Sequence, residues 1–115
     1  MRDPFFDFGC PMNVLSAHLC LVSSLIVSER PMPIRFFYKE NPSHQNDTGF
    51  RFYSGLESDD FLQTDEAACV APLDCMIRVD PTIQSLIEQS NVGSVWERLP
   101  NTNDWSEVLD YQIPA

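Results

Sequence analysis

Basic residues are scarce in this sequence of 115 residues. Lys and Arg number 7 against 17 Asp and Glu, which gives a net charge of -10. Nucleic-acid-binding proteins obtain their phosphate contacts from clustered Lys and Arg, so this composition argues against a nucleic-acid partner. An acidic surface either keeps a protein soluble through self-repulsion or attracts a basic protein. The composition alone leaves both interpretations open.

Metal-binding patterns are missing too. The only histidines are His18 and His44, and no two cysteines have the separation of a zinc half-site. A site built from His18, Cys20, Cys69 and Cys75 would need four isolated ligands to converge. Cys20 and Cys69 lie in apolar runs, where a thiol packs as a small hydrophobic group. We therefore expect no metal and no cofactor.

No segment has the features of a membrane span or of a signal peptide. The most apolar stretch, residues 12–27, is too short and too polar to cross a bilayer. Asp3 and Asp7 precede it where a signal peptide has a basic flank, and no small-residue cleavage site follows. The sequence therefore predicts a cytoplasmic protein without a membrane partner.

The motifs of common enzyme classes are also absent. There is no G-x-S-x-G elbow, no glycine-rich phosphate loop and no H-E-x-x-H helix. The acidic run at residues 57–66 lacks the central glycine of an EF-hand calcium loop. Asp59 and Asp60 are adjacent, so their side chains diverge and do not converge across a substrate. We expect no catalytic residue and no enzyme activity.

The length of the chain suits one domain, which can bury a core without covalent staples. Residues 1–13 contain Pro4, Pro11 and three phenylalanines and are predicted to form an N-terminal arm. Residues 14–115 are predicted to form a single domain.

Alternating side chains predict an antiparallel hairpin from residues 34–40 and 49–54, which turn-forming residues connect. Phe50 and Phe52 share one side of the second strand, opposite Arg51 and Tyr53. Cross-strand aromatic pairs stabilise a sheet, so we expect the phenylalanines to lie in the core.

The remaining elements are short. Apolar runs predict strands at residues 18–27 and 68–71, and residues 94–99 and 104–113 predict a second hairpin. A helix is predicted to begin at Asp80, the N-cap, with Pro81 at its first position. The fold class is therefore α+β, with a mainly antiparallel sheet of five to six strands and one or two short helices packed on it.

Arg51 and the acidic run after it are the main candidates for a functional surface. Arg51 is expected to pair with a carboxylate of that run in a surface contact. An anion-binding role is the alternative for this residue. The acidic run itself is either a solvated loop or a docking surface for another protein.

Several segments of the chain resemble immunity-protein family thirty-three, a bacterial family first classed as a domain of unknown function. In chain order they are CLVSSLI, FFYKENP, DTGFRFYSG followed by acids, DPTIQSLI and VGSVWER, spread over residues 18–109. TGFRFYSGLESDDF is the most specific of them. The sequence departs from the family at residues 1–13, which look extra, and at Phe50, where a tryptophan is expected.

The resemblance implies a non-enzymatic protein that neutralises a cognate toxin by binding it inside the producing cell. Residues that would bind this protein toxin are Arg51, Tyr53, Glu57, Asp59, Asp60, Asp65 and Glu66. An acidic surface of this kind would speed association with a basic toxin. The alternative function is a small regulatory or ligand-binding module, with a pocket near Tyr38, Arg51 and Tyr53.

Overall fold

The structure is a computed structural model that describes residues 18–64, 67–99 and 101–113. The predicted arm at residues 1–13 lies outside the described residues, and so do Asp65 and Glu66.

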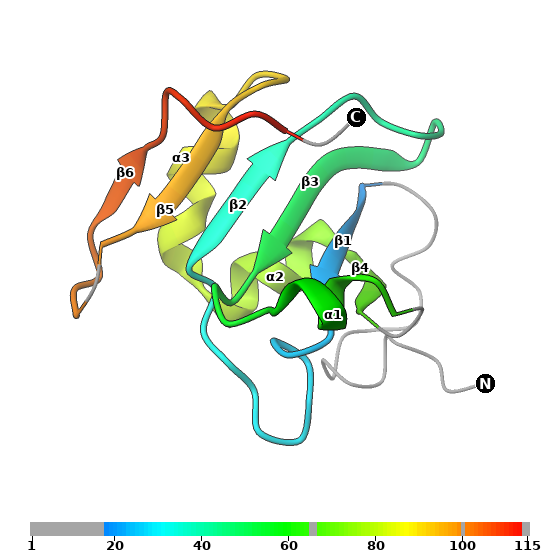
Figure 1. Cartoon of the computed structure of the whole chain (residues 1–115). Helices are drawn as coiled ribbons and strands as arrows, with labels where there is room; N and C mark the ends of the chain where they lie inside the picture. The colour runs from blue at the N-terminus through cyan, green and yellow to red at the C-terminus, as the bar shows by residue number, and fades with distance from the viewer. Residues whose placement is uncertain (1–17, 65–66, 100, 114–115) are drawn as a thin grey trace.

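A six-stranded sheet forms the framework of the protein (Figure 1). Its strands are β1 (Leu19–Ser23), β2 (Phe36–Lys39), β3 (Asp47–Tyr53), β4 (Ala68–Pro72), β5 (Val95–Arg98) and β6 (Trp105–Glu107). In space their order is β4-β1-β3-β2-β5-β6. Only the β1–β3 pair is parallel, and the other neighbouring strands of the described sheet are antiparallel. The predicted α+β fold with a mainly antiparallel sheet is confirmed.

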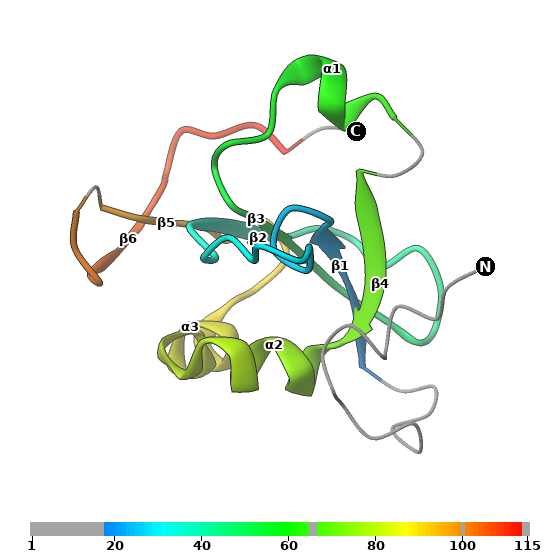
Figure 2. The ribbon, with the colours of Figure 1, turned by 90° about the horizontal axis from the view of Figure 1, so that it is seen from below.

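Short helices lie on both sides of this sheet (Figure 2). They are α1 (Asp59–Leu62), α2 (Leu73–Val79) and α3 (Gln84–Gln89), with a 3-10 turn, η2 (Pro81–Ile83), directly before α3. Figure 2 shows α2 and α3 covering one face of the sheet and α1 lying on the opposite side. None of the helices in the described part of the chain is long and apolar enough to span a membrane.

The predicted helix start at Asp80 is confirmed. The Asp80 Oδ1 accepts a hydrogen bond from the backbone N–H of Thr82 at 3.1 Å, which satisfies one of the free donors at the helix N-terminus. Pro81 occupies the first position, where its missing N–H costs nothing. The helix begins as the 3-10 turn η2 and continues as α3.

Both predicted hairpins are also confirmed. In the first, Phe37 of β2 pairs with Phe52 of β3, and Tyr38 pairs with Arg51. In the second, β5 and β6 are antiparallel neighbours. The indole N–H of Trp96 on β5 donates to the Ser90 hydroxyl at 3.0 Å, which ties this hairpin to the end of α3.

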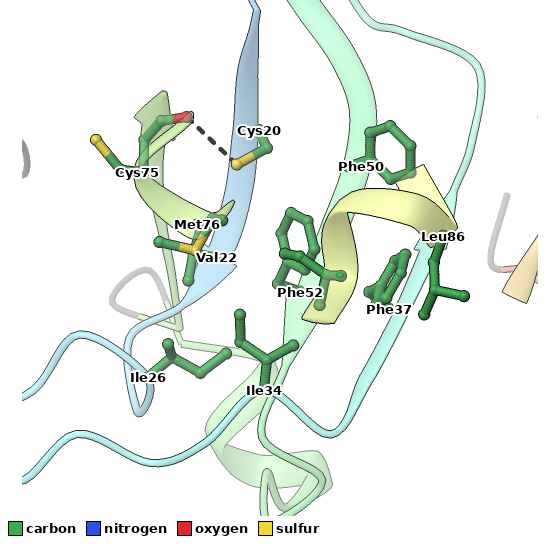
Figure 3. Packing of buried hydrophobic residues seen from close by; sticks show 12 residues of the cluster. Cys20, Val22, Ile26, Ile34, Phe37, Phe50, Phe52, Cys75, Met76 and Leu86 are labelled. Atoms are coloured by element: carbon green, nitrogen blue, oxygen red, sulfur yellow. Dashed lines mark hydrogen bonds between the residues drawn. The ribbon is translucent and has the colours of Figure 1, made fainter. Parts of the chain in front are cut away.

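The hydrophobic core lies between the sheet and the two helices α2 and α3 (Figure 3). Its fully buried side chains include Val22, Phe37, Phe52, Met76 and Ile83. Phe50 and Phe52 belong to this core, as predicted. The buried Cys20 thiol donates a hydrogen bond to the Ala71 carbonyl at 3.3 Å, so it packs as a small core residue of β1.

The aromatic residues of the first hairpin are divided between the two faces of the sheet. Successive side chains of a strand point to opposite faces, so the neighbours of the buried phenylalanines point away from the helices. These neighbours are Phe36, Tyr38, Arg51 and Tyr53. The second face therefore carries aromatic groups that α2 and α3 do not cover.

A bulge disrupts the pairing of β1 with β3. Leu19 lies beside Asp47 and Leu21 lies beside Arg51, so β3 contains two extra residues in this interval. Gly49 lies inside the bulge with φ of +88°, a conformation that glycine adopts without a steric penalty. The bulge bends β3 and brings Asp47 and Arg51 close to each other.

Candidate partner-docking surface

Four aromatic rings form a connected cluster on the sheet face opposite α2 and α3. Phe36 and Tyr38 come from β2, Tyr53 ends β3, and Tyr111 comes from the segment after β6. Tyr38 and Tyr53 stack with their ring centroids 5.9 Å apart, and Tyr111 contacts Phe36 edge to face at 5.0 Å. We call this cluster the aromatic face.

The aromatic face is continuous because each ring contacts a neighbour. The hydroxyl oxygens of Tyr38 and Tyr53 lie 3.2 Å apart and share a hydrogen bond. Burial raises the pKa of the Tyr38 hydroxyl, and the hydrogen bond with Tyr53 raises it further. The Tyr38 hydroxyl therefore stays protonated at neutral pH, and its hydrogen bond with Tyr53 places a shared polar group on an apolar surface.

A cavity of 210 Å³ opens between the aromatic face and the segment that contains α1. Its lining consists of the four rings together with Gly55, Glu57 and Leu62. Among the described residues that line it, none is basic and Glu57 is the one charged group. Figure 2 shows α1 and the segment that follows β6 on the side of the sheet opposite α2 and α3.

Exposed apolar side chains flank the cavity on both sides. Leu56 and Leu62 belong to the α1 segment and are 65% and 45% exposed, whereas Leu109 and Tyr111 belong to the C-terminal segment and are 87% and 41% exposed. A large apolar side chain in water forgoes about 1.5–3 kcal/mol of burial free energy. Exposed apolar groups that gather around one hollow are typical of a surface that another molecule covers.

Glu57 holds the chain in its turn at the end of β3. Its carboxylate accepts hydrogen bonds from the Ser54 backbone N–H at 2.8 Å, the Ser54 hydroxyl at 2.7 Å and the Gly55 backbone N–H at 2.9 Å. Burial raises the pKa of the Glu57 carboxyl, but hydrogen bonds from Ser23, Ser54 and the backbone outweigh it, and the net shift is downward. Glu57 is therefore ionised at neutral pH.

Replacing Glu57 by Gln is expected to lower the free energy of unfolding by about 1 kcal/mol at pH 7, because charge-assisted hydrogen bonds are lost. The pKa of Glu57 is lower in the folded protein, so its contribution is fully present above the unfolded pKa of ~4.3 and is lost as the pH falls below it. Urea denaturation at pH 7, 5 and 3.5 measures the difference, which should shrink toward pH 3.5. The exposed Glu88→Gln on α3 is the matched control, and a constant deficit for Glu57→Gln at every pH would contradict this account.

Arg51 is the centre of a buried ion network on the same face of the sheet as Tyr38 and Tyr53. It is 4% exposed. Its guanidinium donates to both carboxylate oxygens of Asp47, at 2.9 and 2.7 Å, and to Glu40 at 2.5 Å. The expected surface contact between Arg51 and the acidic run is wrong, because the bulge in β3 brings the closer carboxylate of Asp47 to the guanidinium.

Within the ion network, Asp47 and Arg51 each stabilise the charged form of the other. Hydrogen bonding to Arg51 holds the pKa of the Asp47 carboxyl well below its usual range, and N–H donors from Ser43 and Gly49 lower it further. The same bond to Asp47 raises the pKa of Arg51. Two carboxylates surround one guanidinium, so the network carries a net negative charge.

The structure places the predicted partner-binding residues in three settings. Tyr53 and Glu57 line the cavity. Asp59 and Asp60 form the exposed first turn of α1, where Ser58 caps the helix. Arg51 is inside the ion network and does not line the cavity, while the last two residues of the predicted set lie outside the described residues.

Sequence reasoning missed the contribution of the C-terminal segment. Residues 104–113 alternate and were predicted to be one strand, but β6 ends at Glu107. The backbone N–H of Val108 donates to the Val95 carbonyl at 2.8 Å, and beyond it Tyr111 reaches the aromatic face. The alternation of Leu109 and Tyr111 with Asp110 resembles that of a strand, so it gave no local signal for this role.

A second hollow of 430 Å³ adjoins the first. It shares Phe36 and Gly55 with the cavity and adds charges of both signs from Arg35, Glu97 and Arg98. Arg98 also pairs with Asp80, which belongs to the opposite, helical side. The two hollows therefore adjoin each other, and Glu57 lines only the first of them.

Within residues 18–64, 67–99 and 101–113, no three side chains of His, Cys, Asp or Glu lie close enough to hold a metal ion. The aromatic face consists of rings and a shared hydroxyl pair, and beside it the ionised Glu57 carboxylate already accepts three hydrogen bonds from Ser54 and Gly55. This arrangement suits recognition of another molecule by shape and charge.

Comparison with known proteins supports this interpretation. A family model, the immunity protein Imm33 domain, matches residues 20–109. The chain belongs to the Imm33 family. The resemblance found in the sequence is thereby confirmed, and the matched region includes β2 to β6, all of β1 except Leu19, and every cavity-lining residue except Tyr111. Neither the curated proteins nor the solved structures contain a significant match to this Imm33 protein.

Membership of this family gives the general role. An immunity protein neutralises a toxin by binding it, and such families are generally non-enzymatic. A protein with this role needs a complementary surface and no reactive group.

Proposed function

We propose that this Imm33 protein neutralises its cognate toxin by covering it with the aromatic face and the acidic segment beside it, residues 57–66. The observation that carries the proposal is the cavity at Glu57, which exposed apolar side chains surround. Residues 14–115 would act as the single binding domain. Binding would take place in the cytoplasm of the producing cell, before the toxin leaves it.

The anatomy of this surface supports the proposal. Protein interfaces combine an apolar, aromatic centre with a polar rim, and tyrosines are enriched among the residues that contribute most to binding. Here Tyr53 and Tyr111 are at the centre, and Asp59 and Asp60 are at the edge. The opposite face of the sheet is occupied by α2 and α3 (Figure 2), so it is not available to a partner.

The charge of the chain supports a basic toxin. The net charge of -10 attracts a positively charged protein over a distance of about 10 Å, the screening length near physiological salt. Such attraction mainly raises the association rate. Asp59 and Asp60 belong to α1, whose Leu62 lines the cavity, so they would also orient the partner as it arrives.

Neutralising the acids of α1 tests the surface. Asp59→Asn/Asp60→Asn is expected to lower the association rate constant with the toxin encoded beside this gene by about tenfold at low salt, with little change in the dissociation rate. Surface plasmon resonance at 50 and 300 mM salt measures both rates, and the difference should diminish at the higher salt.

The matched control removes the same charge from the other side of the sheet. Asp74→Asn/Glu88→Gln changes two exposed carboxylates on α2 and α3 and is expected to alter the association rate far less. Equal rates for the two double variants would contradict the assignment of this surface. Absence of any binding by the unaltered protein, together with failure to protect cells from the toxin, would contradict the proposed function.

A further inference from the structure

We infer that the cavity of the aromatic face receives one basic side chain, an arginine or a lysine, of the bound partner. The inference rests on the proposed function and goes further, because it names the chemistry that the partner must present. Three properties of the cavity support it: its size, its lining and its charge.

The size of the cavity fits a side chain. Pockets that enclose drug-sized ligands measure about 300–1,000 Å³. The cavity at Glu57 measures 210 Å³, so it suits a single long side chain better than a free ligand of that class. Two exposed residues line it, Leu62 from the α1 segment and Tyr111 from the C-terminal segment, so a side chain of a partner could enter from solvent.

The lining is suited to a cation. Ring faces attract guanidinium and ammonium groups through the negative potential above the ring, and arginine also stacks on them. Tyr53 and Tyr111 present rings to the cavity from opposite segments of the chain. In the hydroxyl pair of Tyr38 and Tyr53 one oxygen donates to the other, which leaves acceptor positions for an N–H donor.

The charges around the cavity determine which charge a bound side chain can carry. The ionised Glu57 lines it, and Asp59 and Asp60 follow on α1. The guanidinium of Arg51 does not line the cavity, and two carboxylates already compensate its charge. Arg35 belongs to the adjoining hollow and does not line the cavity. An anionic guest would therefore be repelled, and a cationic one would be attracted.

The inference can be tested without the toxin. The probe is a capped arginine, N-acetyl-arginine amide, titrated into the isotopically labelled full chain and followed by NMR. We expect shift changes centred on Tyr38, Tyr53 and Tyr111, with a dissociation constant in the millimolar range. Capped citrulline has nearly the same shape without the charge and is expected to bind at least about tenfold more weakly, because the cation–π attraction is lost.

Variants of Tyr111 separate the ring from its hydroxyl. This residue is 41% exposed and is not part of the hydrophobic core, so its replacement leaves the fold intact. Tyr111→Leu is expected to weaken binding of capped arginine about fivefold, whereas Tyr111→Phe keeps the ring and is expected to bind like the unaltered protein. Equal binding of arginine and citrulline, or shift changes elsewhere on the molecule, would overturn the inference.

The same variants distinguish this inference from the proposed function when the toxin is added. Loss of toxin affinity in Tyr111→Leu but not in Tyr111→Phe would support both. Full toxin affinity in Tyr111→Leu would overturn the cavity assignment and leave the proposed function standing. Specific binding of capped arginine without any binding of the toxin would support the cavity and contradict the proposed function.

Discussion

Replacing Arg51 by Met is expected to lower the free energy of unfolding by about 3–5 kcal/mol, the loss typical when one partner of a buried ion pair is removed. Arg51 supplies three hydrogen bonds to Asp47 and Glu40. Without it, Asp47 would be buried as an uncompensated carboxylate, since its side chain is only 6% exposed. Because native proteins are stable by only about 5–15 kcal/mol, this variant is expected to be close to unfolding.

Two control variants show whether the loss of stability in Arg51→Met comes from the geometry of the Arg51 contacts or from its charge. Arg51→Lys keeps the charge but loses the two-pronged contact with Asp47, so we expect a smaller loss of about 1–2 kcal/mol. Arg78→Met changes an exposed arginine on α2 and is expected to cost less than ~0.5 kcal/mol. Urea denaturation at pH 7 gives all three values. An Arg51→Met variant as stable as Arg78→Met would show that the buried network contributes nothing.

Replacing Gly49 by Ala is expected to lower the free energy of unfolding by about 2–4 kcal/mol, the sum of a backbone penalty and a steric one. Gly49 has φ of +88°, which a residue with a Cβ rarely adopts. A Cβ at this position would lie 2.2 Å from the Glu40 carbonyl oxygen. That oxygen is backbone, and the Glu40 N–H is bonded to the Gly49 carbonyl at 2.9 Å, so β2 cannot move away without losing the hairpin.

Gly55 provides the matched control for this prediction. Its φ of +86° is almost the same, but the nearest atom to an added Cβ is the Arg35 Cβ at 3.8 Å, an ordinary contact. Gly55→Ala is therefore expected to cost only the backbone penalty, about 1–2 kcal/mol. Thermal and urea denaturation compare the two variants. Equal losses would mean that the steric contact at Gly49 is relieved by a shift of the bulge.

The predictions for Arg51 and Gly49 concern the buried residues that hold the docking surface in place. The bulge at Gly49 allows Asp47 to reach Arg51, and Arg51 lies on the same face as Tyr38 and next to Tyr53 along β3. Variants that break this support are expected to lose toxin binding through unfolding. Variants of Tyr111 and of Asp59 with Asp60 are expected to lose binding while the protein stays folded. Circular dichroism on each variant separates the two causes.

Local pattern was sufficient for most of the fold. The hairpin of β2 and β3 follows from strict alternation, because side chains of a strand point alternately to two faces. The helix start at Asp80 follows from the capping side chain and the proline behind it, both of which act within three residues. The family resemblance likewise depended on the order of short segments. For the hairpin and the helix start, the physical cause is an interaction between residues that are close together in the chain.

Long-range contacts determine the order of the strands and the burial of Arg51, which the sequence pattern did not predict. The parallel pairing of β1 with β3 sets the sheet order, but neither strand carries a local signal for it. Arg51 was expected to make a surface contact with the acidic run, because it points to the face of the strand opposite Phe50 and Phe52. Its burial depends on the bulge at Gly49, which is a property of two paired strands and not of one.

Residues 46–66 illustrate this division. Their alternation alone placed Phe50 and Phe52 in the core, and their acids alone excluded a calcium loop and an acid–base pair. Whether those acids lie beside a binding surface depended on Tyr111, a residue more than forty positions away. Tyr111 contacts Phe36 and Tyr38 of β2 and so completes the aromatic face. Strand periodicity acts between neighbours and is written in the sequence, whereas a binding cavity forms where distant segments meet, and so it emerges only when the chain is folded.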